Sequence, residues 1–179
     1  MTTLYWKHEG TTKNIPTKEF PHEGDFEKYI FENQDLLGNV VIIDRQIRTG
    51  TRQGILDMLG VDQDGNICLI EIKNVQASED VIPQVLGYLV WAENNPDSIK
   101  AIWLEAKNKP EEINIDWDSI QIRIIIIAPS FAPNVLRMTS KINYTIDLIQ
   151  IQRFSDDHDE FILVETLEDT SYKKTVTTK

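Results

Sequence analysis

The chain has 179 residues, 41% hydrophobic and 26% charged, which suits one globular domain with a substantial core. Its formal net charge of −11 argues against a broad basic face that grips nucleic acid without specificity. No apolar run is longer than that at residues 124–128, which is far shorter than the roughly 20 residues a membrane-spanning helix needs.

The single cysteine, Cys68, excludes an intrachain disulfide and a cysteine-based metal cluster, and its apolar neighbours predict a small buried side chain. No apolar segment typical of a secretory signal stands at the N-terminus, so we expect a cytoplasmic protein without membrane contact. We expect an N-terminal extension at residues 1–20, a folded domain at 21–167, and a flexible tail at 168–179, where apolar residues almost disappear.

Apolar residues recur at helical spacing in some segments and form short runs or alternate in others. In chain order we expect a strand at 3–7, a helix at 25–37, strands at 40–47 and 54–61, a tight turn at 62–66, a strand at 67–73, a helix at 78–93, a strand at 101–106, an acidic loop at 108–118, a strand at 120–128, a short helix at 134–141, and strands at 144–154 and 160–167. This order predicts an α/β fold, in which one mixed sheet is flanked by helices.

Two carboxylates and one amine are predicted to meet at one hairpin. The turn at residues 62–66 joins the strand of Asp57 to that of Glu71 and Lys73 and can bring the two carboxylates together. Glu71 and Lys73 are two residues apart in a strand, so they point to one face while Ile72 points to the other. Such acidic side chains in apolar strands are tolerated when they are paired or bind a metal.

Two nearby carboxylates repel each other unless a cation lies between them, and oxygen ligands favour Mg²⁺ or Mn²⁺. The backbone carbonyl of Ile72 can complete the protein's share of the ligands. Lys73 has two candidate roles: when neutral it positions or deprotonates the attacking water, and when protonated it stabilises charge on phosphorus. We therefore predict a metal-dependent site that cuts phosphodiester bonds.

The order of these residues resembles the PD-(D/E)XK nuclease superfamily and, within it, the catalytic domain of NucS-type endonucleases. The likeness covers residues 25–154, with Asp57 at the metal-binding Asp and Glu71-Ile72-Lys73 at the Glu-x-Lys motif. It implies that residues 21–167 form a restriction-endonuclease-like core, which cleaves DNA with Mg²⁺ or Mn²⁺ in repair or in restriction and defence.

The same resemblance implies further site residues on two helices. Glu27 matches the metal-site glutamate of the helix before the first core strand, with Glu32 as the alternative. Gln84 and Tyr88 match a Gln-x-x-x-Tyr motif. They are four residues apart, hence on one helix face, and can orient Lys73, the scissile phosphate or a nearby strand.

The chain departs from the family's pattern in three ways. Leu56 and Gln34 stand where the family's motifs have proline, and neither change removes a ligand. NucS-type enzymes also carry an N-terminal domain for dimerisation and DNA binding, whereas about 20 residues precede the expected core here. The partners we expect besides DNA are a second copy of the chain or an accessory DNA-binding protein.

Two other functions stand beside this one. The acidity and the different N-terminus suit a non-catalytic binding module that keeps the nuclease fold, and the site residues themselves do not separate DNA from RNA. Arg45, Arg48 and Arg52 precede the Asp57 strand, where they either contact the phosphate backbone or are simply solvated.

Overall fold

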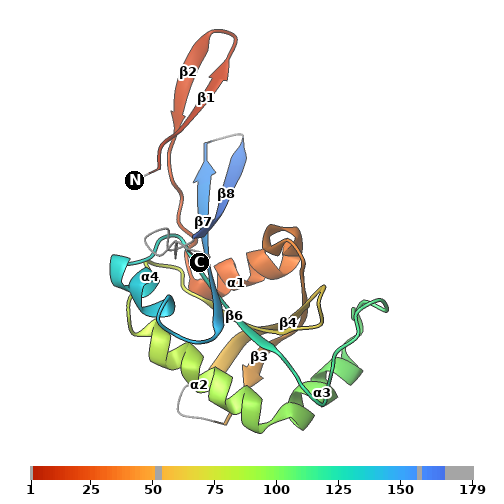
Figure 1. Cartoon of the computed structure of the whole chain (residues 1–179). Helices are drawn as coiled ribbons and strands as arrows, with labels where there is room; N and C mark the ends of the chain where they lie inside the picture. The colour runs from red at the N-terminus through yellow and green to blue at the C-terminus, as the bar shows by residue number, and fades with distance from the viewer. Residues whose placement is uncertain (1, 51–53, 157–158, 168–179) are drawn as a thin grey trace, which may run out of the picture.

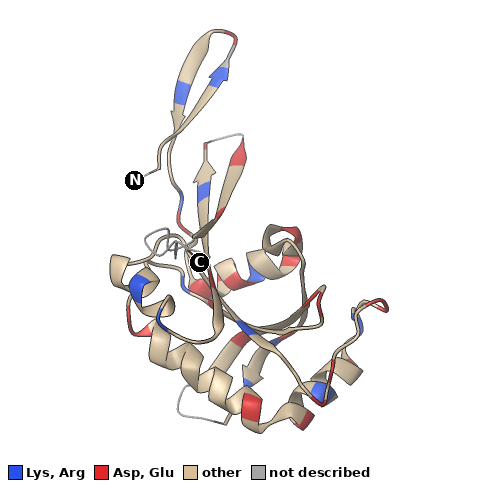
Figure 2. Cartoon of the chain, in the orientation of Figure 1, with Lys and Arg blue, Asp and Glu red and all other residues tan. Residues whose placement is uncertain are grey.

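The computed structural model describes residues 2–50, 54–156 and 159–167, so Arg52 and the expected tail at 168–179 lie outside the described residues. A two-stranded sheet and a six-stranded mixed sheet form the β-structure, and helices cover both faces of the larger sheet (Figure 1). The predicted α/β architecture is confirmed. Figure 2 shows Lys and Arg scattered among Asp and Glu over the described residues.

The six strands of the main sheet are ordered β3-β4-β5-β6-β7-β8. They comprise β3 (Val40–Arg48), β4 (Ile55–Asp62), β5 (Ile67–Ile72), β6 (Ile122–Ala128), β7 (Thr145–Ser155) and β8 (Glu160–Leu167), all within two residues of the predicted strands. Strands β5, β6 and β7 are mutually parallel, and the other neighbours pair antiparallel. The carboxyl ends of the three parallel strands therefore meet at one edge of the sheet, the usual place for a site in such sheets.

The β4–β5 hairpin turns where the sequence predicts. Asp62 Oδ1 accepts hydrogen bonds from the backbone N–H groups of Asp64 at 3.0 Å and Asn66 at 2.9 Å. Gly65 has a φ of 81°, and a Cβ there would lie 2.4 Å from the carbonyl oxygen of Asn114. Both the backbone conformation and the close approach therefore require glycine at this position.

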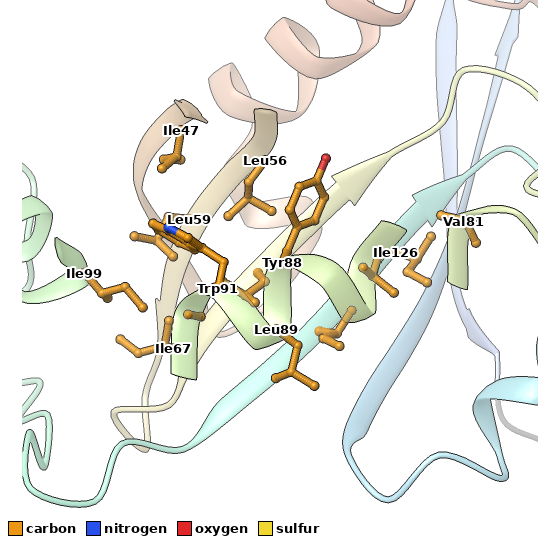
Figure 3. Close-up of a cluster of buried hydrophobic side chains, with 14 of the residues drawn as sticks. Ile47, Leu56, Leu59, Ile67, Val81, Tyr88, Leu89, Trp91, Ile99 and Ile126 are labelled. Atoms are coloured by element: carbon orange, nitrogen blue, oxygen red, sulfur yellow. The ribbon is translucent and has the colours of Figure 1, made fainter. Parts of the chain in front are cut away.

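Two apolar layers sandwich the main sheet. One lies under α1 (Glu23–Glu32) and the short 3₁₀ helix η1 (Gln34–Leu37), and includes the buried Cys68. The other lies under α2 (Val81–Asn94), α3 (Pro96–Glu105) and α4 (Pro133–Thr139), as Figure 3 shows for α2. Among the described residues no helix is long and apolar enough to cross a membrane.

The strand predicted at 101–106 is wrong, because this segment belongs to α3. Pro96 stands in the first helical turn, where a missing N–H costs nothing, and Asp97 follows it. Ile99 and Trp103, four residues apart, are both buried against the sheet. The predicted strand covers only six residues, which is too short a segment to show the helical spacing of apolar residues. The helix predicted at 25–37 is also divided, between α1 and η1.

A two-stranded sheet of β1 (Leu4–His8) and β2 (Thr11–Ile15) projects from the body beside the β7–β8 ribbon (Figure 1). The Trp6 and Phe161 rings lie 5.6 Å apart, and Ser155 N–H donates to the carbonyl of Pro16 at 3.1 Å. The sequence predicts β1 but not β2, whose residues are mostly polar.

Candidate active site

Asp57 lies where β4 and β5 separate. The register between these strands runs from Val61–Ile67 to Met58–Ile70 and stops there. Beyond it, Asp57 Oδ2 accepts a hydrogen bond from the backbone N–H of Ile72 at 2.8 Å. The carboxylate thus takes the place of a backbone acceptor and is turned toward the end of β5.

Glu71 is the most buried charged residue of the site, with 1% of its surface exposed. Its Oε1 accepts a hydrogen bond from Lys73 Nζ at 2.5 Å, whereas Oε2 is buried and has no hydrogen-bond partner among the described residues. Burial first, and then the charge of Asp57, raise the pKa of Glu71. Burial also raises the pKa of Asp57, against the hydrogen bond from Ile72. The pair is therefore costly to ionise without a compensating cation.

Lys73 points back to Glu71, as the two-residue spacing predicts. Burial lowers the pKa of Lys73, but the hydrogen bond and the charge of Glu71 outweigh burial and raise the pKa above its ordinary value. The ammonium group is therefore protonated at neutral pH. This favours the second of its two candidate roles, the stabilisation of negative charge.

Gln84 and Tyr88 contact the nearby strand rather than Lys73. Gln84 Nε2 donates to the Tyr88 hydroxyl at 3.0 Å, and that hydroxyl donates to the carbonyl of Ile55 at 2.7 Å. The Tyr88 ring is fully buried between α2 and the sheet (Figure 3). The motif therefore anchors the start of β4, two residues before Asp57.

Glu27 is buried on α1, and both its oxygens are occupied. Oε1 lies 2.8 Å from both Nε and Nη2 of Arg45, and Oε2 accepts from Gln46 Nε2 at 2.7 Å. The charge of Glu27 also acts on Asp57. The alternative, Glu32, forms an exposed ion pair with Lys28.

Two residues near the site were missed by the sequence analysis. Besides burial, the negative charge of Glu23 contributes to the raised pKa values of Asp57 and Glu71. Its spacing of four residues from Glu27 was the available signal. Gln46 has a φ of 55°, in the left-handed region. Because glutamine rarely adopts this conformation, its residue type gave no sign of it.

The donor set suits a hard cation but does not form a closed cage. Among the described residues, no group of three or more Asp, Glu, His or Cys side chains is arranged to hold a metal ion. Asp57 and Glu71 nevertheless supply only oxygen donors, and Glu71 Oε2 has no partner among the described residues and could accept a ligand.

Comparisons with known proteins point to nucleases. No protein-family model matches the chain. Endonuclease NucS of Aeropyrum pernix is 35% identical over 90 residues, which are 45% of this chain and 34% of that protein. Endonuclease NucS of Pyrococcus horikoshii is 26% identical over 122 residues, 66% of this chain and 38% of that protein. The chain thus spans little more than a third of these curated relatives.

A solved structure of an EndoMS–dsDNA complex shares the fold. The TM-score is 0.51 at 19% sequence identity, over 78% of this chain and 51% of that chain. The chain therefore has the restriction-endonuclease-like fold of NucS and EndoMS, and the resemblance predicted from sequence is confirmed.

Proposed function

We propose that this chain, with its NucS/EndoMS fold, is an endonuclease that hydrolyses phosphodiester bonds of DNA in repair or in restriction and defence. The observation that carries the proposal is Glu71, a buried carboxylate beside Asp57 with one oxygen on Lys73 and the other unpaired. The two curated relatives are named endonucleases, and the EndoMS structure contains double-stranded DNA, which supports DNA as the partner.

The proposed cofactor is Mg²⁺ or Mn²⁺, held by Asp57, Glu71 and the backbone carbonyl of Ile72. Such an ion would supply a Lewis acid for the phosphate and a more acidic bound water. Glu27, the fourth predicted ligand, already accepts from Arg45 and Gln46, so it would have only the second lone pair of Oε2 left for the ion.

The chain's own residues prepare the site for this chemistry. The Ile72 N–H orients Asp57, and Tyr88 with Gln84 fixes the strand that carries it. The protonated Lys73 is placed to stabilise negative charge that develops on the phosphoryl oxygens. These groups act by position and charge, as phosphoryl chemistry requires.

Cleavage assays test the proposal directly. Branched, single-stranded and duplex DNA are incubated with the protein and Mn²⁺. We expect cleavage that Asp57→Ala and Lys73→Ala each reduce by about a hundredfold or more, since each removes a charge from the reacting centre. Asp118→Ala and Lys107→Ala, both on exposed residues, are matched controls and should cut normally. Cleavage by the two site variants at the wild-type rate would refute the assignment.

The open ligand set favours a second candidate, a non-catalytic nuclease-fold module. Calorimetry with Mn²⁺ separates the two: no heat of binding, together with no cleavage, would favour the module. RNA of the same sequence, in the same assay, tests the RNA-cleaving alternative.

A homodimer or an accessory DNA-binding protein is the proposed further partner, because a duplex has two strands to cut, and because a net charge of −11 gives the chain little non-specific attraction to DNA. If the further partner is a second copy of the chain, sedimentation of the protein alone at micromolar concentration should show a species heavier than 20.7 kDa.

A further inference from the structure

We infer that Arg45 is a phosphate-binding residue beside the proposed metal site, and that Glu27 and Gln46 are positioning residues that aim it. The inference rests on the proposed action on DNA. It gives Glu27 a role other than the metal ligand that the family resemblance implies.

The guanidinium of Arg45 is held from two directions. Arg45 lies on β3 opposite Met58, the residue after Asp57, and its partner Glu27 is close enough for its charge to act on Asp57. Its Nε and Nη2 both lie 2.8 Å from Glu27 Oε1, and its Cζ lies 4.7 Å from the centre of the Phe31 ring. A carboxylate and an aromatic ring on α1 therefore restrict both the direction and the plane of the group before any ligand arrives.

The backbone conformation of Gln46 allows two consecutive residues, Arg45 and Gln46, to contact Glu27. Consecutive residues of a regular strand point to opposite faces, yet Arg45 and Gln46 both contact the same carboxylate, Glu27. The left-handed φ of 55° at Gln46 breaks the alternation and brings its amide to Glu27 Oε2. A non-glycine residue in this region is strained, and such strain is concentrated at functional sites.

Arg45 keeps donors for a ligand. Its side chain is 30% exposed, and within the described part of the chain its Nη1 has no hydrogen-bond partner. A guanidinium group whose plane is fixed can donate hydrogen bonds to two oxygens of one phosphate. Because Asp57, Glu71 and Glu23 make the surroundings acidic, a backbone phosphate would need a cation besides Lys73 to bind there.

Binding assays without metal test Arg45 independently of cleavage. Fluorescence anisotropy with a labelled DNA duplex is measured over a series of salt concentrations in EDTA. We expect Arg45→Gln to weaken binding about tenfold and to reduce the slope of log K against log salt by about one. Arg45→Lys should keep the slope but lose part of the affinity. Lys100→Gln, which removes an exposed charge on α3 across the sheet, is the matched control.

The positioning role is tested by coupling. Glu27→Gln and Gln46→Gly should each weaken DNA binding about threefold, and neither should weaken it further when Arg45 is already Gln. Glu27→Gln should leave the Kd for Mn²⁺, measured by calorimetry, within about threefold, whereas loss of a true ligand would cost tenfold or more. Thermal melts confirm that each variant is folded.

The outcomes separate this inference from the proposed function. DNA binding by Arg45→Gln with the wild-type Kd and salt slope would overturn the inference, even if the wild type cuts DNA. Loss of Mn²⁺ binding in Glu27→Gln with DNA binding intact would overturn the positioning role. A wild-type protein that binds DNA through Arg45 but never cuts it would overturn the proposed endonuclease activity and leave the role of Arg45 intact.

Discussion

At the scale of single residues, Glu71 has the most unusual environment. The folded state favours its protonated form, because burial and Asp57 raise its pKa. A carboxyl group whose pKa is raised by folding stabilises the fold below its ordinary pKa. That contribution is lost as the pH rises through the raised pKa.

The stability of the metal-free protein should therefore depend on pH through Glu71. Between about pH 5 and pH 9, wild-type Tm should fall relative to that of Glu71→Gln, which cannot ionise there. Circular-dichroism melts in EDTA measure the difference between the two proteins at each pH. Mn²⁺ should raise the wild-type Tm at high pH and leave the variant nearly unchanged. Parallel pH profiles for the two proteins would contradict a pKa of Glu71 that is raised by burial and by Asp57.

The Tyr88 hydroxyl allows a second prediction at this scale. Tyr88→Phe removes the part-buried hydrogen bond to the carbonyl of Ile55, so the free energy of unfolding should fall by about 1 kcal/mol. Cleavage should also slow, because β4 positions Asp57. Tyr144→Phe is the matched control, since its hydroxyl contacts Glu93 at the surface. Urea denaturation that gave equal losses for both would exclude the anchoring role.

At the scale of elements, α3 shows where short apolar runs mislead. Residues 101–106 suit a strand or a helix equally, and only the wider window from Pro96 shows the helical period. Strand β2 escaped prediction for the opposite reason, since it is polar and depends on pairing with β1. The strands of the main sheet were predictable because long apolar runs flank clear turn residues.

The helical assignment of α3 has a direct test. Ile99 is fully buried and Leu104 is 61% exposed. Ile99→Ala should lower the free energy of unfolding by about 2–4 kcal/mol, whereas Leu104→Ala should change it by less than about 0.5 kcal/mol. Chemical denaturation measures both. Comparable losses at the two positions would be incompatible with this helix face.

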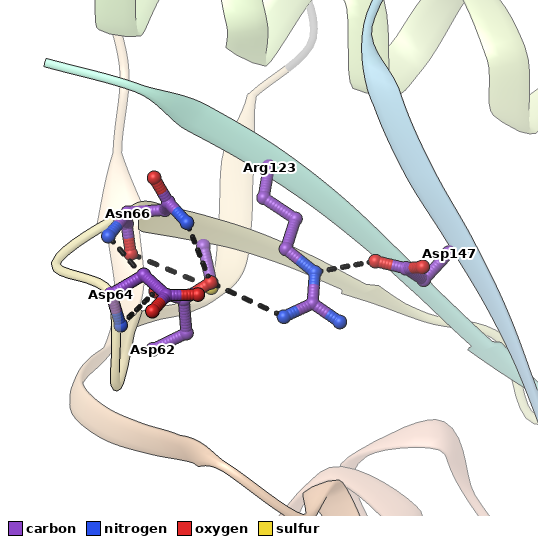
Figure 4. A network of polar contacts seen from close by, with 6 residues as sticks. Asp62, Asp64, Asn66, Arg123 and Asp147 are labelled. Atoms are coloured by element: carbon purple, nitrogen blue, oxygen red, sulfur yellow. Dashed lines mark hydrogen bonds and ion pairs between the residues drawn. The ribbon is translucent and has the colours of Figure 1, made fainter.

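At the scale of the whole molecule, the two edges of the main sheet have different roles. The carboxyl end of β5 and the start of β4 carry the candidate active site. At the other edge Arg123 joins two strands, through Asp62 Oδ2 at 3.3 Å and Asp147 Oδ2 at 2.5 Å (Figure 4). Asp62 is 2% exposed, and this network ties the β4–β5 turn to β6 and β7.

Because the two edges are separate, a variant at the Arg123 edge should lower the free energy of unfolding without changing the rate of DNA cleavage. Arg123→Gln leaves Asp62 without its cation but with its hydrogen bonds from the turn, so unfolding should become easier by about 1–3 kcal/mol. DNA cleavage per folded molecule should stay at the wild-type rate. A loss of cleavage larger than the loss of folded protein would show that the two edges are coupled.

The sequence by itself determined where the six strands of the main sheet lie along the chain, where the hairpin turns, and that Asp57, Glu71 and Lys73 fall at that hairpin, because these features follow from local periodicity and turn chemistry. Only the tertiary structure decided what Glu27 and the Gln84–Tyr88 pair contact, and that Glu71 keeps one oxygen unpaired. Those features depend on where β4 leaves β5, on a left-handed residue in β3 and on α1 lying against it. Contacts between segments far apart in the chain leave no periodic signal in the sequence.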